Sequence, residues 1–146
     1  MPAPYTGRCL CGAVRLTIAA EPLFVGMCWC HDCQRIACGS AVVAATFPSD
    51  RVSVSGTTAS STKVADSGNG IERVFCPRCG TQLLGRSAGG GDVVRVRVGA
   101  LDDTEAFAPR AVIWADSAPD WAVIDPALDR YGRQPPAPAA PVPDRT

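Results

Sequence analysis

The stretch Cys28-Trp29-Cys30-His31-Asp32-Cys33 places three cysteines within six residues. Two shorter motifs have the same character, Cys9-Leu10-Cys11 near the N-terminus and Cys76-Pro77-Arg78-Cys79-Gly80 in the middle of the chain. Seven of the eight cysteines therefore lie in tight clusters, a pattern typical of tetrahedral thiolate coordination of zinc. A structural zinc site has four protein ligands, whereas a catalytic site keeps one position open. Seven cysteines divide into four and three. This division predicts two zinc sites, one filled by four protein ligands and one with a position open to a substrate.

Two other uses of cysteine fit the sequence less well. Disulfide frameworks belong to oxidising compartments and usually follow a signal peptide, but residues 1–8 contain no charged start followed by an apolar run. A thioredoxin-like CxxC pair begins a helix inside a βαβ pattern, which this sequence lacks. Metal binding is therefore the main interpretation, and we expect the protein in the cytoplasm.

Length and composition limit the remaining possibilities. The chain has 146 residues and 47% apolar content, which suits one domain with a hydrophobic core. Its 14 basic residues are balanced by 14 acidic ones, so we expect no nucleic acid partner. Without an apolar stretch of about 20 residues, we expect no membrane span. We predict a zinc-binding domain over residues 1–132 and a mobile Pro/Ala-rich tail over residues 133–146.

Short segments rich in Val, Ile, Thr and aromatic residues alternate with Gly, Pro, Ser and Asp, which predicts a mainly β fold. The expected strands are Leu10 to Ile18, Ser40 to Phe47, Arg51 to Val54, Ile71 to Phe75, Thr81 to Leu84, Val93 to Val98 and Ala111 to Ala115. The clearest alternation is Val94-Arg95-Val96-Arg97-Val98, a strand with one buried and one solvated face. At most a short helix is expected, at Asp32 to Ala37. The small polar residues of Ser53 to Asn69 suggest no chemistry.

The outer cysteine motifs have features of one shared site. If Cys9 and Cys11 lie two residues apart on a strand, they point to the same face. The segment Cys76 to Gly80 predicts a zinc knuckle, because its proline fixes a turn and its glycine permits the positive φ that follows. A zinc ion shared by the two motifs would connect distant parts of the chain and contribute folding energy directly.

The middle motif supplies three thiolates, and the fourth ligand decides its function. Cys38 or the single histidine, His31, can complete a closed structural site. The alternative is an open position, which is the mark of a catalytic zinc, with Cys38 as a small buried residue instead.

The motifs together resemble the glutathione-dependent formaldehyde-activating enzyme family, which shares its domain with centromere protein V. The resemblance rests on five ordered segments: Gly7 to Val14, Cys28 to Arg35 with Gly39 to Ala41, Phe75 to Thr81, Gly99 to Asp102, and Pro109 with Ile113-Trp114, Ser117 and Trp121. It implies an Mss4-like fold of coiled antiparallel β-sheets with zinc knuckles. It also implies a structural zinc on Cys9, Cys11, Cys76 and Cys79, and a second zinc on Cys28, Cys30 and Cys33.

In the family, the second ion binds glutathione and joins it to formaldehyde, a carbon–sulfur lyase reaction that forms S-hydroxymethylglutathione. The resemblance therefore implies an enzyme whose partners are a small thiol such as glutathione and a small aldehyde. Many members carry histidine at two positions where this chain has Trp29 and Ala111. A non-catalytic, zinc-stabilised thiol-binding protein and an interaction module are the alternatives.

Three residues beside the middle motif have two interpretations each. His31 can relay a proton or orient a ligand, or can simply be exposed. Gln34 and Arg35 can hold a carboxylate of the thiol, Arg35 with two hydrogen bonds, or can lie on a solvated helix face.

Overall fold

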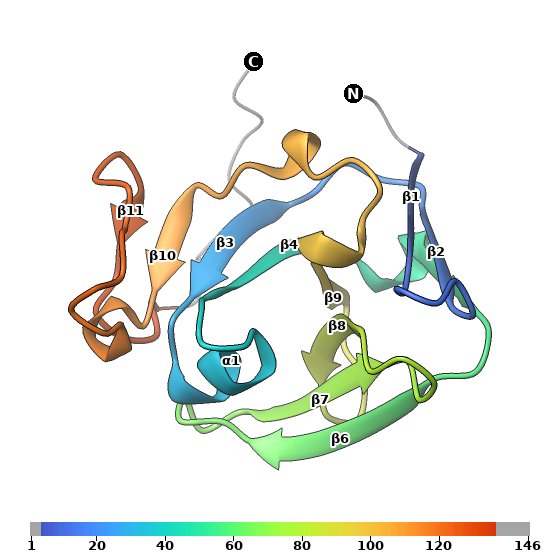
Figure 1. Cartoon of the computed structure of the whole chain (residues 1–146), viewed down its shortest axis with the longest axis horizontal. Coiled ribbons are helices and arrows are strands. Elements are labelled where there is room, and N and C mark those ends of the chain that lie inside the picture. The colour runs from blue at the N-terminus through green and yellow to red at the C-terminus, as the bar shows by residue number, and fades with distance from the viewer. Residues whose placement is uncertain (1–3, 137–146) are drawn as a thin grey trace.

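Two β-sheets form the framework of the protein, which is shown as a computed structural model in Figure 1 and described over residues 4–136. The smaller sheet is antiparallel, with the order β1 (Tyr5–Arg8), β2 (Arg15–Ile18) and β5 (Val52–Ser55). The larger sheet has the order β11 (Asp129–Arg130), β10 (Ala111–Ile113), β3 (Phe24–Cys28), β4 (Val42–Pro48), β9 (Val93–Arg97), β8 (Gln82–Ser87), β7 (Gly70–Phe75) and β6 (Ala59–Val64). The predicted mainly β fold is confirmed.

The larger sheet is mixed rather than wholly antiparallel. Strand β10 runs parallel to both of its neighbours, β3 and β11, while the other pairs are antiparallel. The α-helix α1 (His31–Ile36) follows β3, one residue earlier at each end than predicted. Short 3₁₀ helices complete the described elements: η1 (Ser49–Arg51), η2 (Val98–Ala100), η3 (Glu105–Phe107) and η4 (Ala115–Ser117). Within residues 4–136, no helix is long and apolar enough to span a membrane.

The main hydrophobic core lies between the smaller sheet and one face of the larger sheet. It contains Leu16 and Ile18 of β2 together with Phe47 of β4 and Val96 of β9, all 1% exposed or less. Because side chains alternate along a strand, the residues on either side of Phe47 in β4 and of Val96 in β9 point to the other face of the larger sheet. Arg95 and Arg97 are therefore on that second face, as the alternation in the sequence predicts.

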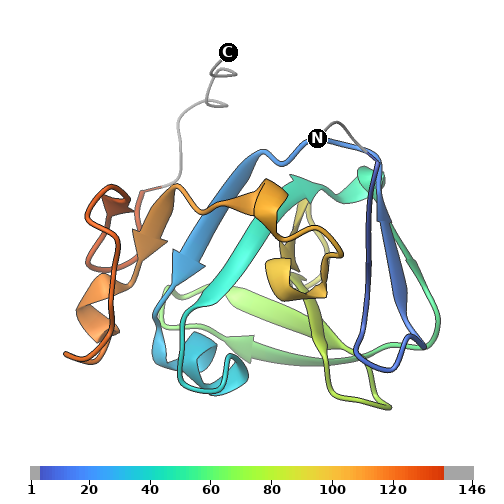
Figure 2. The same ribbon diagram turned by 45° about the horizontal axis from the view of Figure 1, so that its top comes forward.

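The larger sheet curls around its second face. In Figures 1 and 2, the strands turn from β3 and β4 through β9 and β8 to β7 and β6, and α1 lies between the two ends of the curl. Asp32 of α1 links the helix to the far end, since its carboxylate lies 2.7 Å from Nζ of Lys63 in β6 and 4.0 Å from Nη2 of Arg73 in β7. The curl and the helix together enclose one side of the sheet.

Several strand predictions need correction. Residues 10–14 form a turn rather than the start of a strand, and β2 begins only at Arg15. The sequence does not predict strands β1, β3, β6 and β11. Strand β6 is the edge of the larger sheet and has almost no buried residue, so its sequence carries no hydrophobic alternation.

The predicted tail over residues 133–146 falls mostly outside the described residues. Its first residues contact the domain: the Trp114 backbone N–H donates to the Arg133 carbonyl at 3.3 Å, and Trp114 Nε1 donates to Gln134 Oε1 at 3.1 Å.

Candidate metal centres

The structure brings Cys9, Cys11, Cys76 and Cys79 together, and we name this group the four-cysteine cluster. Their sulfur atoms all lie within 4.8 Å of one another, with Cys9 and Cys11 at 3.6 Å and Cys11 and Cys76 at 3.9 Å. Four thiolates around zinc, with Zn–S bonds of about 2.3 Å, are spaced about 3.8 Å apart in a regular tetrahedron. The four sulfur atoms therefore fit a tetrahedral metal ion.

Cys9 and Cys11 reach this position from a turn rather than from one strand face. The turn follows β1, and it is closed by hydrogen bonds from Cys9 N to Val14 O and from Gly12 N to Cys9 O. Gly12 has a φ of +79°, a conformation that side chains with a Cβ rarely adopt. The Val14 N–H donates to Cys9 Sγ at 3.3 Å, which stabilises a thiolate there.

The second half of the cluster is a knuckle between β7 and β8, as the sequence predicts. Gly80 N donates to Cys76 O, and Gly80 has a φ of +77°. The Thr81 hydroxyl accepts the Leu10 N–H at 3.0 Å and lies 3.2 Å from Cys79 Sγ, so it connects the two halves. Hydrogen bonds from the side chain and then the backbone of Thr81 lower the pKa of Cys79 to about 5.

A second group, which we name the three-cysteine cluster, consists of Cys28, Cys30 and Cys33. Cys28 ends β3, Cys30 precedes the first residue of α1, and Cys33 lies in the first turn of α1. Their sulfur atoms lie within 4.8 Å of one another, and the Cys33 N–H donates to Cys30 Sγ at 3.3 Å. Hydrogen bonds from Cys28 and then Cys33 lower the pKa of Cys30.

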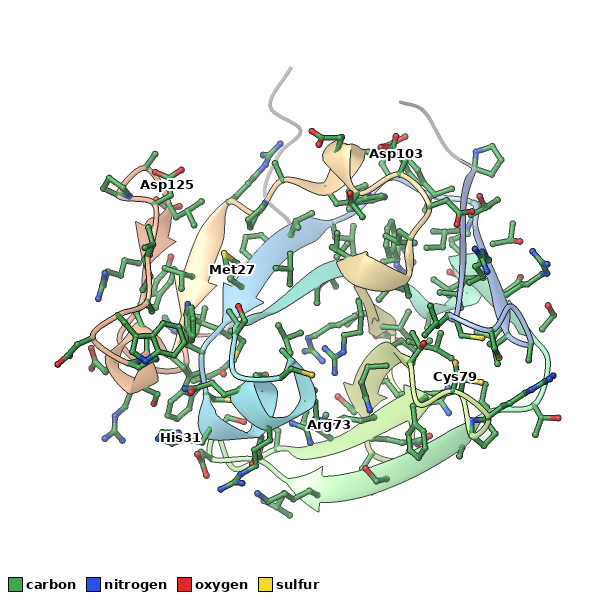
Figure 3. The ribbon with its side chains drawn as sticks, in the orientation of Figure 1. Met27, His31, Arg73, Cys79, Asp103 and Asp125 are labelled. Atoms are coloured by element: carbon green, nitrogen blue, oxygen red, sulfur yellow. The ribbon has the colours of Figure 1, made fainter. Side chains whose placement is uncertain are left out.

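Neither candidate for a fourth protein ligand joins the three-cysteine cluster. His31 is exposed, and Figure 3 shows it at the outer side of α1. Cys38 is also exposed, which corrects the expectation of a buried residue. Its φ of +57° and that of Gly39 at +93° turn the chain away after α1. Among residues 4–136, no further Cys, His, Asp or Glu side chain joins the three cysteines of this cluster.

Gln34 and Arg35 do not face the three-cysteine cluster. The Gln34 amide donates both of its hydrogens to backbone carbonyls, to Trp29 O at 2.8 Å and Ser117 O at 3.0 Å. Gln34 thus connects the start of α1 to η4. Arg35 is exposed in the last turn of α1. Neither residue lines the cavity described next.

All three cysteines of the three-cysteine cluster line a cavity of about 190 Å³ on the curled face of the larger sheet. We name it the thiolate cavity. Its walls come from β3, β4, β7, β8 and β9, with Trp114 and Gln134 on one side and residues 65–67 and 69 on another. Three arginines, Arg73, Arg95 and Arg97, also line it, and Figure 3 shows Arg73 rising from β7 toward α1.

Sequence reasoning missed these arginines as site residues. The alternation of residues 93–98 indicates that Arg95 and Arg97 share a face, but it does not indicate what that face meets. The pairing of β9 with β4 and β8 decides that, and it depends on strands far apart in the chain.

All eight cysteines are free thiols, and all lie within the described residues. The sulfur spacing of the four-cysteine cluster and the all-sulfur donor sets suit zinc, a metal that thiolates bind well. The two clusters lie in different parts of the molecule, Cys79 near the smaller sheet and the three-cysteine cluster beside α1 (Figure 3).

Comparison with known proteins agrees with these features. The family model described as glutathione-dependent formaldehyde-activating enzyme matches residues 4–117. Among solved structures, a Rhodobacter sphaeroides protein from a structural genomics programme has 23% sequence identity and a TM-score of 0.51, covering 66% of this chain and 87% of that chain. At that identity the likeness concerns the fold. No curated protein matches the sequence.

Proposed function

Because this chain belongs to the glutathione-dependent formaldehyde-activating enzyme family, we propose that it is a zinc-dependent carbon–sulfur lyase-type enzyme. Its reaction joins glutathione, or a related thiol, to formaldehyde or another small aldehyde. The observation that carries this proposal is the three-cysteine cluster in the wall of the thiolate cavity. Three protein sulfurs leave one position of a tetrahedral ion for an external thiol.

We further propose that each cluster holds one zinc ion. In the four-cysteine cluster the ion is structural, because all four ligands come from the protein. In the three-cysteine cluster, zinc would keep a coordinated thiol deprotonated near neutral pH. The assigned metal ligands are Cys9, Cys11, Cys76, Cys79, Cys28, Cys30 and Cys33. The domain extends over residues 1–132, and free thiols as metal ligands suit a reducing compartment such as the cytoplasm.

The residues of the thiolate cavity support the addition of a thiol to an aldehyde. The thiol loses its S–H proton, its sulfur forms a new bond to the carbonyl carbon, the C=O π pair moves to oxygen, and oxygen takes up a proton, so the number of protons is unchanged. The reaction needs no oxidant or reductant. Cys28, Cys30 and Cys33 fix where the thiol enters, while the apolar wall of Phe24, Val42, Ala44 and Ile71 limits access of water.

The second candidate is a thiol carrier that performs no reaction. It is favoured by the position of His31, the single histidine of the chain, which is exposed and does not line the thiolate cavity. Proton transfer to the product oxygen therefore cannot use this histidine.

The test measures the rate of S-hydroxymethylglutathione formation by magnetisation-transfer NMR, since formaldehyde and thiols also combine without an enzyme. We expect zinc-loaded protein to exceed the uncatalysed rate and Cys30→Ser to lose this acceleration. Cys38→Ser is the matched control, because Cys38 is exposed and lies outside the three-cysteine cluster. Glutathione binding without acceleration would favour the carrier, and acceleration that persists in Cys30→Ser would contradict the assigned site.

A further inference from the structure

The three arginines of the thiolate cavity are neighbours on one face of the larger sheet. Arg73 of β7 is paired with Gly85 of β8, and Gly85 is paired with Arg95 of β9. Arg97 lies two residues beyond Arg95 and therefore on the same face, paired with Ala44 of β4. Gly85 and Ala44 are small, so they leave room on this face for the side chains of the neighbouring arginines.

Gly85 gives the Arg97 side chain its position. A Cβ atom at Gly85 would lie 2.8 Å from Arg97 Nη2 and 3.4 Å from Cζ, so the guanidinium rests against the β8 backbone where any larger residue would displace it. Gly85 itself is buried. The sheet thus holds the planar end of Arg97 at the floor of the thiolate cavity.

These guanidinium groups are short of partners inside the protein. Arg73 is 8% exposed and has a carboxylate at 4.0 Å, that of Asp32, which is already paired with Lys63 at 2.7 Å. The Nε atoms of Arg73 and Arg97 are buried and have no hydrogen-bond partner. Among residues 4–136, no carboxylate lies within ion-pair distance of Arg95 or Arg97. A buried charged donor without a partner is costly.

The thiolates of the three-cysteine cluster account for only part of this charge. Burial lowers the pKa of Arg97, and the charge of Cys33 acts in the opposite direction. Three thiolates on a divalent ion carry one net negative charge, whereas the cavity contains three guanidinium groups. Asp66 is the acidic residue among those that line the cavity, and it is exposed. The cavity therefore keeps positive charge and free donors for an anionic ligand.

We infer that Arg73, Arg95 and Arg97 form a carboxylate subsite beside the three-cysteine cluster, so that the cavity selects thiols that carry a carboxylate. The inference rests on the proposed function, in which the sulfur of the same molecule occupies the open metal position. Arginine suits this role because its planar group donates two parallel hydrogen bonds to a carboxylate. Arg73 and Arg97 each supply a buried Nε donor, and Arg95 is exposed.

The test compares two thiols of similar shape, 3-mercaptopropionate and the neutral 3-mercaptopropan-1-ol, by calorimetric titration of the zinc-loaded protein. We expect the wild type to bind the carboxylated thiol tighter by about tenfold or more. Arg97→Gln should bring the ratio of the two dissociation constants close to one. Arg86→Gln is the matched control: Arg86 is next to Gly85 on the opposite face of β8, where it pairs with Glu72 at 2.7 Å, so the ratio should stay as in the wild type.

Two results would overturn the inference while the proposed function stands. The first is equal affinity of the wild type for both thiols. The second is an equal loss of affinity for both thiols in Arg97→Gln, which would mean that the arginine serves the metal thiolates rather than the ligand.

A further titration separates this inference from the proposed function. The probe is 3-(methylthio)propionate, which keeps the carboxylate but cannot form a thiolate. If neither thiol binds and this probe binds in the wild type but not in Arg97→Gln, the carboxylate subsite is supported and the proposed function fails. If neither the thiols nor the probe bind, both are wrong.

Discussion

Replacing Cys76 by serine should destabilise the protein far more than replacing Cys30 by serine. Both residues are buried, Cys76 at 0% and Cys30 at 9% exposure, so the two substitutions are matched in environment. They differ in the length of chain that the metal ion closes. The four-cysteine cluster joins Cys11 to Cys76 across 65 positions, whereas the three-cysteine cluster spans only residues 28–33.

The chain-entropy relation for cross-links gives the size of this difference. Closing a loop of 65 residues raises the free energy of the unfolded chain by about 4 kcal/mol, and closing a loop of five residues raises it by about 2 kcal/mol. A chain of this size loses about 2–4 °C of melting temperature per kcal/mol. We therefore expect Cys76→Ser to melt roughly 8–16 °C below the wild type and Cys30→Ser roughly 4–8 °C below it.

Circular dichroism melts together with zinc analysis by mass spectrometry test this reasoning. The wild type should contain two zinc ions per chain, and Cys30→Ser should stay folded with one. Chelation of the wild type should remove zinc in two steps, the three-cysteine ion first. If both variants melt at the same temperature, the division into a structural and an open site is wrong.

Three further substitutions test individual residues. Cys38→Ala should leave the zinc content at two ions, because Cys38 is exposed and outside both clusters, and loss of one ion would show that it is a ligand. Gln34→Leu should lower the free energy of unfolding by about 1–3 kcal/mol in urea titrations, because the carbonyls of Trp29 and Ser117 lose their donor; an unchanged midpoint would contradict this structural role. Gly85→Ala should reduce the preference for 3-mercaptopropionate with both zinc ions retained, because the new Cβ displaces the Arg97 guanidinium; an unchanged preference would show that this position of Arg97 is not needed.

The sequence predicts the fold class and the division of the cysteines well, because both depend on local patterns. The knuckle at Cys76 to Gly80 and the short helix at Cys33 have local signals, a Pro, a Gly and close cysteine spacing. At Cys9 and Cys11 the sequence predicts a strand, whereas the structure has a turn. Two neighbouring apolar residues, Ala13 and Val14, continue into the real strand β2 and extend its pattern backwards.

What the sequence does not predict are the features that depend on strand pairing. Strand β6 has small polar residues and is recognisable only through its partner β7. The arginines of the thiolate cavity come from two strands, and the glycine that separates them comes from a third. Gln34 is in the same category, because its acceptor on Ser117 lies 83 positions away.

In the proposed function, the ion of the three-cysteine cluster accepts an external thiol. The most direct test of this step is cobalt-edge X-ray absorption on protein that carries zinc in the four-cysteine cluster and cobalt in the three-cysteine cluster. We expect three sulfur ligands on cobalt, rising to four when glutathione is added, with the same result in Cys38→Ala. A count that stays at three after glutathione is added, or that is already four before, would contradict this expectation.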